Sequence, residues 1–496
     1  MSVTFTDFLC GAGGSSTGLV ESGLELKLAV NHWDVALETH AANHTRADHL
    51  CIDVSGMPMR YLPKSDVLWA SVICTEISPA GGNTRETPQL DLLDGEDGFK
   101  TLPVAAFERT RVTAWCVVRA TEVHRYKAIV VENVVEFARD WLLFPQWIAA
   151  MTKLGYNYQV TSVSSAHIGD ETNVRAPQWR DRVYVTFTRR GMRKPNLTPS
   201  PPAWCFECGE QVNAIQSWHD PNITVGKYGQ QYSYVCPNAR CGHTKVEPWV
   251  RPASAAIDWT DLGRLIGTRR KPLATTTMNR IRIGLAKYPY EPHSITINHG
   301  QDGGDRAYAL AQRPMPVRST KQSEAMIVPA GGSWNTEPYP ATRPLRTRTT
   351  SESEALFTAP PFIVEYRNNA TASSVHAPVA SVTAQGNHHG LVMPNGRVDP
   401  RDRNTLVIPY RKSTAKHAGM PFHTLSTKDS AAIVVSAEDI DNCRFRMLKP
   451  REQLAAQRFP DSYIVLGTPT EQTIQAGNAV SCNVAHWIGR QLLDVL

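Results

Sequence analysis

The stretch that decides the fold is VTFTDFLCGAGGSSTG, residues 3–18. VTFTDFLC predicts a β-strand, and the glycine turn after it leads into a helix. Gly11, Gly13 and Gly14 allow the backbone of such a turn to pass close to a ligand at the helix N-terminus. The alternative is a tight structural turn without a ligand. The spacing is not the dinucleotide-binding fingerprint, because Ser16 stands at the third glycine position.

The alternation of strands and helices continues from this unit to about residue 190. Further strands are predicted, in chain order, at LKLAVN, LCIDV, DVLWASVIC, KAIVVENVV and RVYVTFTRR, and a long amphipathic helix spans residues 102–125. This pattern predicts a mostly parallel sheet with helices on both faces. We therefore expect an α/β domain over residues 1–194.

Polar and reactive side chains stand where these predicted strands end. Ligands of a doubly wound sheet bind at the carboxyl ends of its strands, so we expect these side chains to meet. Trp33 would stack on a purine and Asp53 would accept a hydrogen bond from an adenine amino group, although a core indole and a turn carboxylate are the plainer interpretations. Cys74, Glu132 and Asn133 stand at the ends of later strands, and the segment APQWRDRVYV adds Gln178, Arg180 and Arg182 at the start of the last one.

The cysteine in VICTEISPAGG, residues 72–82, raises a specific question. It lies between an apolar strand and a stretch of small residues, which predicts a thiol at the tip of a loop. Such a thiol is a buried filler, a metal ligand or a nucleophile. A free cysteine is only a few per cent thiolate near neutral pH, and cationic neighbours raise that fraction.

The chain changes character after PNLTPSPPAW, residues 195–204, which predicts a linker. Residues 250–440 are rich in Thr, Ser, Pro and Arg and contain a degenerate repeat that begins at Pro272, Pro316, Pro344, Pro378 and Pro421. Each copy has a proline, an apolar residue, closely spaced Ser or Thr, a polar turn and an apolar pair. The pattern resembles repeated β-hairpins of irregular spacing. The last 55 residues return to helical and strand patterns.

Length and charge narrow the class of protein. A chain of 496 residues is too long for one ordinary core and predicts about two to four domains. We see no membrane-length apolar run and no secretory signal. Residues 251–420 carry a net charge of about +10, whereas the rest of the chain is near −4. The basic block indicates a polyanionic partner, with a solvated basic surface as the alternative.

Four of the ten cysteines form a separate signal. They lie in two close pairs, CFEC and CPNARC, with 27 residues between the pairs. This spacing is typical of a structural zinc ribbon, and the alternative is four unrelated buried cysteines. The predicted ligands are Cys205, Cys208, Cys236 and Cys241, with His243 as a minor substitute for Cys241. We interpret the cysteines in the periodic segments as core residues: Cys10, Cys51, Cys116, Cys443 and Cys482.

Six motifs in one order give the chain a resemblance to a known family. They are DFLCGAGGSSTGL, SVICTEISPAGG, VENVV, PQWRDR, FRMLKPREQLAAQRFPDSY and QAGNAVSCNVAHWIG. Together they resemble the cytosine-5 DNA methyltransferases of bacterial and phage type. The resemblance covers about residues 3–190 and 441–496. The repeats between 250 and 440 also resemble the target-recognition region of some members.

The resemblance assigns a role to each reactive residue. Cys74 matches the nucleophile that attacks C6 of cytosine, and Glu132 matches the carboxylate that contacts N3 and the exocyclic amine. Arg182 matches the arginine near cytosine O2, and Arg180 its companion near the catalytic loop. A base inside a duplex cannot be reached, so it must be flipped out, and SPAGGNTRETPQL would be the loop that closes behind it.

The resemblance also implies the cofactor and the fold. S-adenosylmethionine would bind a Rossmann-like sheet, and residues 441–496 would return to complete the catalytic domain. Residues 195–250 would form a zinc-ribbon insert, and residues 251–440 a β-rich target-recognition region. The residues implied in cofactor binding are Leu9, Gly11, Gly13, Gly14, His32, Trp33, Asp53 and Asn478.

Three positions depart from the family pattern. Ile73 stands where proline usually precedes the cysteine, so a backbone restraint is lost. Leu9 replaces the phenylalanine that packs on the cofactor. His32 replaces the acidic residue that binds the ribose hydroxyls, so a strong acceptor is lost. These departures concern cofactor affinity and leave the nucleophile in place.

We therefore expect a methyltransferase that acts on C5 of cytosine in double-stranded DNA. One rival is the branch of the family that modifies tRNA, which the large basic insert disfavours. A second rival is a catalytically impaired DNA-binding relative, and a nicotinamide oxidoreductase is a distant third. We further expect a monomer without a membrane segment, in the cytoplasm of a bacterial host or phage-infected cell. The sequence leaves open whether a restriction enzyme accompanies the methyltransferase.

Overall fold

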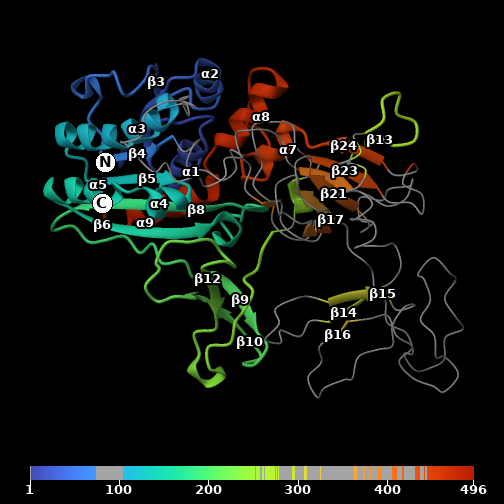
Figure 1. Cartoon of the computed structure of the whole chain (residues 1–496). Helices are drawn as coiled ribbons and strands as arrows, with labels where there is room; N and C mark the ends of the chain where they lie inside the picture. Colours follow the sequence, from blue (N-terminus) through green and yellow to red (C-terminus); the bar gives the residue numbers. More distant parts are fainter. Residues whose placement is uncertain are drawn as a thin grey trace, which may run out of the picture.

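The computed structural model describes residues 2–73, 104–251 and 444–496 throughout. Between 253 and 441 it describes shorter stretches, chiefly strands. Figure 1 shows the large sheet with its helices, the four-strand module β9 to β12 beside it, and the C-terminal helices returning to the sheet.

Seven strands form the central sheet, in the order β3-β2-β1-β4-β5-β8-β6. They are β1 (Thr4–Phe8), β2 (Glu25–Asn31), β3 (Asp48–Cys51), β4 (Val67–Ser71), β5 (Ala128–Asn133), β6 (Tyr156–Ser164) and β8 (Asp181–Arg189). The strands from β3 to β5 pair in parallel, whereas β8 is antiparallel to both β5 and β6. The order reverses between β1 and β4, where α/β sheets bind their ligands. The predicted α/β fold is confirmed.

Strand β6 is absent from the sequence-based prediction. Its sequence, YNYQVTSVS, is largely polar, and its first half is only partly buried because it is the outer strand of the sheet. An outer strand lacks the apolar run that identifies a central one. The whole of β6 is nevertheless paired with β8, from Tyr156 opposite Arg189 to Ser164 opposite Asp181.

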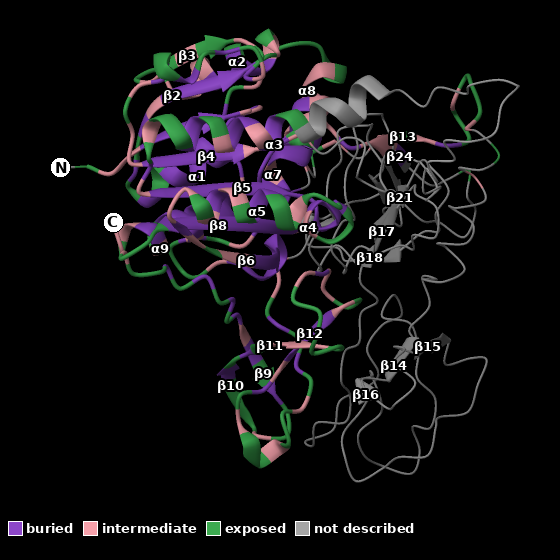
Figure 2. Ribbon diagram, turned by 60° about the vertical axis from the view of Figure 1, so that its left-hand side comes forward, coloured by how far each residue is buried: buried purple, intermediate pink, exposed green. Residues whose placement is uncertain are grey.

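Helices cover both faces of this sheet (Figure 2). The described α-helices of the chain are α1 (Gly14–Ser22), α2 (Asp34–Asn43), α3 (Val104–His124), α4 (Val135–Asp140), α5 (Phe144–Lys153), α7 (Pro450–Ala455), α8 (Pro469–Asn478) and α9 (Cys482–Leu493). Alternate residues of β4 serve the two faces, as the pleat of a strand requires. Leu68 and Ala70 pack in the cluster that includes α3 and α5, whereas Val67 and Trp69 pack in the cluster that includes α1 and α9.

The C-terminal segment is an integral layer of the first domain. Helix α9 packs against α1, and small residues permit the close approach. A Cβ added to Gly18 would collide with the carbonyl oxygen of Cys482, and one added to Gly489 would collide with the Ser22 hydroxyl. The Asn483 amide also donates to the carbonyls of residues 165 and 168, at 2.8 and 2.7 Å.

Residues 195–250 form two small sheets around a core of their own. β9 (Pro202–Cys205) pairs with β10 (Glu210–Asn213), and β11 (Ile215–Trp218) pairs with β12 (Tyr232–Val235), both antiparallel. Tyr232 and Tyr234 are completely buried there, together with Cys205 and Cys236.

The basic block contributes short strands to several sheets. They are β13 (Arg264–Leu265), β14 (His293–Thr296), β15 (Arg306–Ala309), β16 (Glu324–Ala325), β17 (Phe362–Glu365), β18 (Ser373–Ser374), β19 (Val379–Ala380), β20 (His389–Val392), β21 (Thr405–Pro409), β22 (Lys416–His417) and β23 (Ala431–Val435), followed by β24 (Arg444–Met447). In the repeat that begins at Pro378, β19 pairs with β7 (Gln178–Trp179), whereas β20 pairs with β17, β23 and β24. The predicted hairpin is wrong for this repeat, because its two strands pair with different partners.

Two further sequence-based expectations have clear outcomes. Cys10, Cys116 and Cys482 are buried as predicted, but Cys51 is exposed, because it ends the outer strand β3. Cys443 lies outside the described residues. Among the described helices, none combines the length and the apolar character that crossing a bilayer requires.

Substitution of Gly18 by alanine tests the closure between α1 and α9. The new methyl group would also lie 2.7 Å from the Ala485 Cβ, so the helices must separate. We expect a loss of about 2 kcal/mol or more in the free energy of unfolding, measured by denaturant titration. Gly56→Ala is the matched control, because its Cβ would meet only the Asp53 carbonyl oxygen, at 4.0 Å. Equal stability of the two variants would contradict the packing argument.

Candidate active site

The described residues among those predicted at strand ends lie along one edge of the sheet. β1, β2 and β3 are parallel neighbours there, with Phe8 opposite Val30 and Asn31 opposite Cys51. The ladder runs on past the strands, since the amide of Cys10 donates to the Val30 carbonyl at 3.2 Å. The predicted cofactor residues next to these strand ends are Leu9, Gly11, His32, Trp33 and Asp53.

The three glycines of the first turn serve different purposes. A Cβ on Gly11 would meet no heavy atom within 4 Å, so its face of the turn is open. A Cβ on Gly13 would lie 2.6 Å from the Tyr463 hydroxyl, and one on Gly14 would collide with the Val480 carbonyl. Gly11 is therefore free to approach a ligand, whereas Gly13 and Gly14 make room for the C-terminal segment.

Leu9 has an unusual backbone conformation. Its φ angle is +57°, a region that residues with a Cβ rarely adopt and that concentrates at functional sites. The side chain is half-buried and packs against the core beneath α3 and α5. The strained position directly follows β1, next to the strand-order reversal.

The other cofactor candidates lie in contrasting environments. His32 and Asp53 are exposed, and Trp33 is half-buried. The Trp33 amide donates to Asn31 Oδ1 at 3.1 Å, which fixes the turn after β2, and Asp53 Oδ1 accepts from the amide of Ser55 at 2.8 Å. Trp33 thus presents a partly open indole, and Asp53 is a turn residue with an accessible carboxylate.

A buried carboxyl group lies directly beneath the glycine turn. Asp7 is completely buried, and its Oδ2 accepts from the hydroxyls of Ser15 and Ser16, each at 2.6 Å. Burial raises the pKa of Asp7 to about 7 against these two hydrogen bonds, which lower it. Within the described part of the chain, Asp7 Oδ1 has no hydrogen-bond partner.

Three histidines that the sequence analysis did not single out continue this polar layer. His40 Nε2 lies 3.0 Å from Ser16 Oγ, its Nδ1 lies 2.8 Å from His49 Nε2, and His44 Nε2 lies 3.1 Å from Thr17 Oγ1. Burial lowers the pKa of all three, that of His44 to about 4. Neutral rings therefore support the turn. The four-residue spacing of His40, on α2, and His44, directly after it, was the sequence signal that could have indicated this layer.

Glu132 and Arg182 form an ion pair at the same edge. Glu132 is the second-last residue of β5 and Arg182 the second residue of β8, and Arg182 Nε lies 3.1 Å from Glu132 Oε1. Both side chains are about nine-tenths buried. Burying two charges costs so much desolvation that such a pair is a weak source of stability. A role in orienting the Glu132 carboxylate therefore explains the pair better than a contribution to stability does.

Arg180 is turned toward the C-terminal segment. Its guanidinium donates to the carbonyl of Ala479 at 2.6 Å and lies 3.4 Å from that of Gly477. These two carbonyls flank Asn478, which ends α8 and is exposed. Arg180 therefore anchors the loop that carries Asn478, while Arg182, two residues later in the chain, faces Glu132.

The predicted nucleophile, Cys74, lies outside the described residues, but the segment that leads to it is described. The Asn133 side chain donates to the Val72 carbonyl at 3.1 Å. The amide of Ile73 donates to the Thr113 hydroxyl at 3.4 Å, a bond that a proline at this position could not make. Asn133 and Thr113 thus hold the backbone that ends one residue before Cys74.

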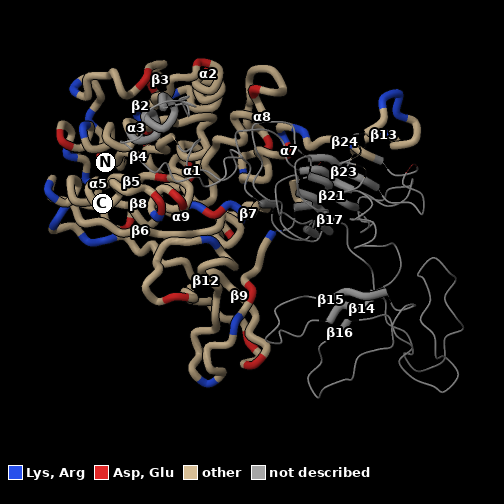
Figure 3. The backbone as a smooth tube through the Cα atoms, viewed as in Figure 1, with Lys and Arg blue, Asp and Glu red and all other residues tan. Residues whose placement is uncertain are grey.

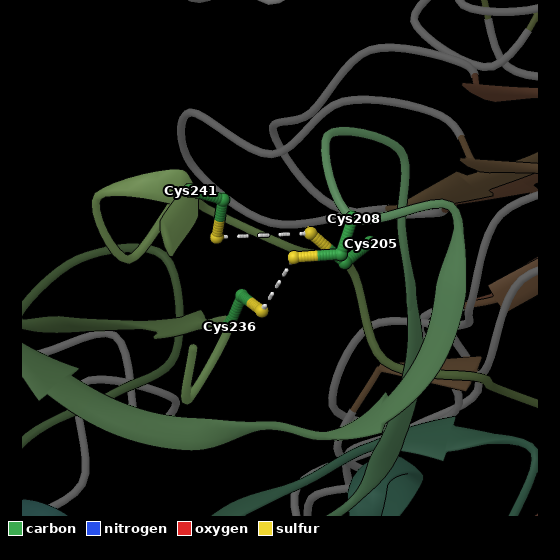
Figure 4. A group of neighbouring side chains, drawn as sticks. All are labelled: Cys205, Cys208, Cys236 and Cys241. Atoms are coloured by element: carbon green, nitrogen blue, oxygen red, sulfur yellow. Dashed lines mark hydrogen bonds between the residues drawn. The ribbon is translucent and has the colours of Figure 1, made fainter. Parts of the chain in front are cut away.

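The four predicted zinc ligands come together. Their sulfur atoms all lie within 4.8 Å of one another, with 4.0 Å between Cys205 and Cys241 and 3.9 Å between Cys208 and Cys236 (Figure 4). Tetrahedral zinc with bonds of about 2.3 Å separates its sulfurs by roughly 3.8 Å. His243 is not part of this cluster, and its Nδ1 lies 2.9 Å from the Cys236 carbonyl oxygen instead.

Comparison with known proteins now places the chain. The family model of the C-5 cytosine-specific DNA methylases matches residues 3–217 and 341–494, and the chain belongs to this family. It is therefore a methyltransferase of the kind that uses S-adenosylmethionine. The match omits residues 218–340, which contain Cys236, Cys241 and the first half of the basic block. No curated protein matches the chain.

Solved structures show distant similarities. A mutant of the DNMT2 protein of Spodoptera frugiperda has 11% identity and a TM-score of 0.46, covering 99% of this chain and 100% of that one. A putative DNA modification methyltransferase of an E. coli prophage has 12% identity and a TM-score of 0.40, covering 100% and 99%. The Entamoeba histolytica methyltransferase EhMeth has 12% identity and a TM-score of 0.41, covering 100% and 98%. At these scores the similarities support no argument about this chain.

The pH dependence of stability tests the burial of Asp7. Its folded pKa, about 7, lies above the ordinary value of 3.8, so the unfolded chain releases the proton first as the pH rises. The folded state therefore loses stability between about pH 4 and pH 7, by about 1 kcal/mol per unit. We therefore expect the melting temperature of Asp7→Asn, relative to that of the wild type, to increase as the pH rises from 5 to 7. Parallel pH profiles would show that Asp7 is ionised in the folded protein.

Proposed function

We propose that the protein methylates C5 of cytosine in double-stranded DNA, with Cys74 as the nucleophile. The observation that carries this proposal is the buried pair of Glu132 and Arg182, at the sheet edge where Asn133 also holds the backbone leading to Cys74. A carboxylate fixed by a guanidinium beside a cysteine loop suits addition to a pyrimidine ring.

The chemistry follows from these groups. The Cys74 thiolate forms a bond to C6 of a flipped cytosine, while Glu132 holds N3 and the exocyclic amine, and Arg182 orients Glu132 and contacts O2. When bound, S-adenosylmethionine supplies the methyl group that C5 receives. Loss of the C5 proton and elimination of Cys74 then restore the ring and free the enzyme.

The residues at the ends of β1, β2 and β3 suit this cofactor. The open face of Gly11 allows close approach, the half-buried Trp33 offers a stacking surface, and the exposed Asp53 offers an acceptor. Leu9 and the exposed Asn478 would complete the pocket, in which Gly13 and Gly14 act by seating the C-terminal segment. His32 provides no carboxylate for the ribose, which predicts a weaker hold on that part of the cofactor.

DNA is favoured as the substrate by the basic block. In its described part, Arg264, Arg270 and Lys271 are exposed at and beyond β13 (Figure 3), which suits contact with phosphates. Residues 251–440 are accordingly proposed as the target-recognition region, acting with the catalytic domain of residues 1–194 and 441–496. The same proposal includes base flipping and a monomeric state. It also places the protein in the cytoplasm of a bacterium or phage-infected cell.

Labelled S-adenosylmethionine tests the substrate and the nucleophile together. Wild-type protein should label cytosine C5 in duplex DNA, and it should stay covalently attached to DNA that contains 5-fluorocytosine, because fluorine blocks the final elimination. Cys74→Ser should reduce labelling to background and keep DNA binding, since a hydroxyl is far less ionised than a thiol. Labelling of tRNA in place of DNA would assign the protein to the RNA-modifying branch. Full activity of the serine variant would refute the nucleophile.

We also propose that residues 195–250 form a zinc ribbon. The convergence of four sulfurs at separations near those of a tetrahedral site supports this. The small core of the module supports it further, because a segment of this size needs a staple to fold alone. Arg240 Nε donates to Cys208 Sγ at 3.4 Å, a contact that favours the thiolate a metal requires.

Metal analysis of purified protein that has never met a chelator tests the ribbon. We expect one zinc per chain and a lower melting temperature after chelation. Cys236→Ser should lose the metal, whereas Cys51→Ser should retain it, because the exposed Cys51 lies outside the cluster. Metal-free wild-type protein with an unchanged melting profile would show that the four thiols merely pack together.

A further inference from the structure

We propose that residues 226–228, a loop of the four-cysteine module, position the pair of Glu132 and Arg182 for catalysis. The inference rests on the proposed function, because it concerns how that site is held. The loop lies between β11 and β12 of the module. It contacts α4, the helix that follows the strand of Glu132, and β8, the strand of Arg182.

The first contact is an ion pair between Lys227 and Glu136, four residues after Glu132 in the chain. Lys227 Nζ lies 2.6 Å from Oε1 of Glu136, whose side chain is only 5% exposed. Glu136 belongs to α4, which starts two residues after β5 ends, so it shares a short rigid segment with Glu132. A buried carboxylate needs a close cation, and the other nearby cation, Arg139, is 3.9 Å away. Lys227 is thus the main partner of Glu136.

The second contact is to the segment that presents Arg182. The amide of Tyr228 donates to Asp181 Oδ1 at 3.1 Å, and Asp181 lies between Arg180 and Arg182. The ring of Tyr228 stacks on Trp179, with 5.4 Å between centroids and 17° between planes. The loop therefore holds the residues on either side of Arg180 and fixes the start of β8.

The loop has a defined shape of its own. Gln231 Oε1 accepts from the Lys227 amide at 2.9 Å, and the Gln231 amide returns a bond to the Lys227 carbonyl at 3.0 Å. The Gly226 amide donates to Ser162 Oγ on β6 at 3.2 Å, which attaches the loop to the sheet. β12 follows and ends one residue before Cys236, so the fold of the module sets the place of the loop.

Lys227→Gln is the variant that tests this role. Loss of the charge leaves Glu136 without its main partner, so the end of β5 and the start of β8 should lose their shared support. We expect kcat for DNA methylation to fall by about tenfold or more, while the KM for S-adenosylmethionine stays within about twofold of the wild-type value. This combination is the one expected when the lost interaction acts in the transition state. Lys227→Arg, which keeps the charge, should recover most of the rate.

The matched control is Lys245→Gln, in the same module. Lys245 pairs with Glu247 at 3.2 Å, and both side chains are about half exposed, so its loss should leave kcat unchanged. The proposal is overturned if Lys227→Gln keeps the wild-type kcat, or if Lys227→Arg loses as much as Lys227→Gln, which would indicate simple bracing of the fold.

Hydrogen exchange separates this inference from the proposed function. Amides of residues 178–183 should exchange faster in Lys227→Gln than in the wild type or in Lys245→Gln, whether or not the protein acts on DNA. If the wild type methylates no nucleic acid, the proposed function fails and exchange alone decides the positioning role. Unchanged exchange at residues 178–183 in Lys227→Gln would overturn the inference.

Discussion

The close contact between α9 and α1 is the constraint on which the rest of the molecule depends. Gly14 and Gly18 of α1 let the helix approach the backbone of residues 480–486, and Gly489 leaves room for the Ser22 side chain, so the last helix occupies one place only. That place sets the loop at residues 477–480, which covers Gly14 and supplies the carbonyls that Arg180 binds. The first turn of the chain and the start of β8 are therefore positioned by the same segment.

The edge of the sheet that we propose as the active site combines elements that are separate in the chain. β1 to β3 supply the open face of Gly11 and the side chains for a cofactor, β5 supplies Glu132, and the antiparallel β8 brings Arg182 against it. Because β8 runs opposite to β5, its first residues lie beside the last residues of β5. The module that follows β8 then returns its loop to this meeting point, which explains how an insertion can contact the site.

The sequence predicted the strand–helix alternation, the strand ends and the cysteine cluster, because these depend on local periodicity and short spacings. It missed β6, whose outer position leaves few apolar residues to reveal it. It also assigned Cys51 to the core and a hairpin to the repeat at Pro378, since exposure and strand partners depend on distant segments. The contacts of Gly13 and Gly14 with residues 463 and 480 were equally out of reach of the sequence, because they depend on how the distant C-terminal segment packs.

The sequence by itself determined the family motifs, the order of the elements and the residues available for chemistry. Only the tertiary structure decided that Arg182, and not Arg180, faces Glu132, and that Asp7 lies buried beneath the turn. It alone joined Lys227 to Glu136. The physical reason is that motifs and periodicity are properties of neighbouring residues, whereas burial and pairing of charges depend on which distant segments the fold packs together.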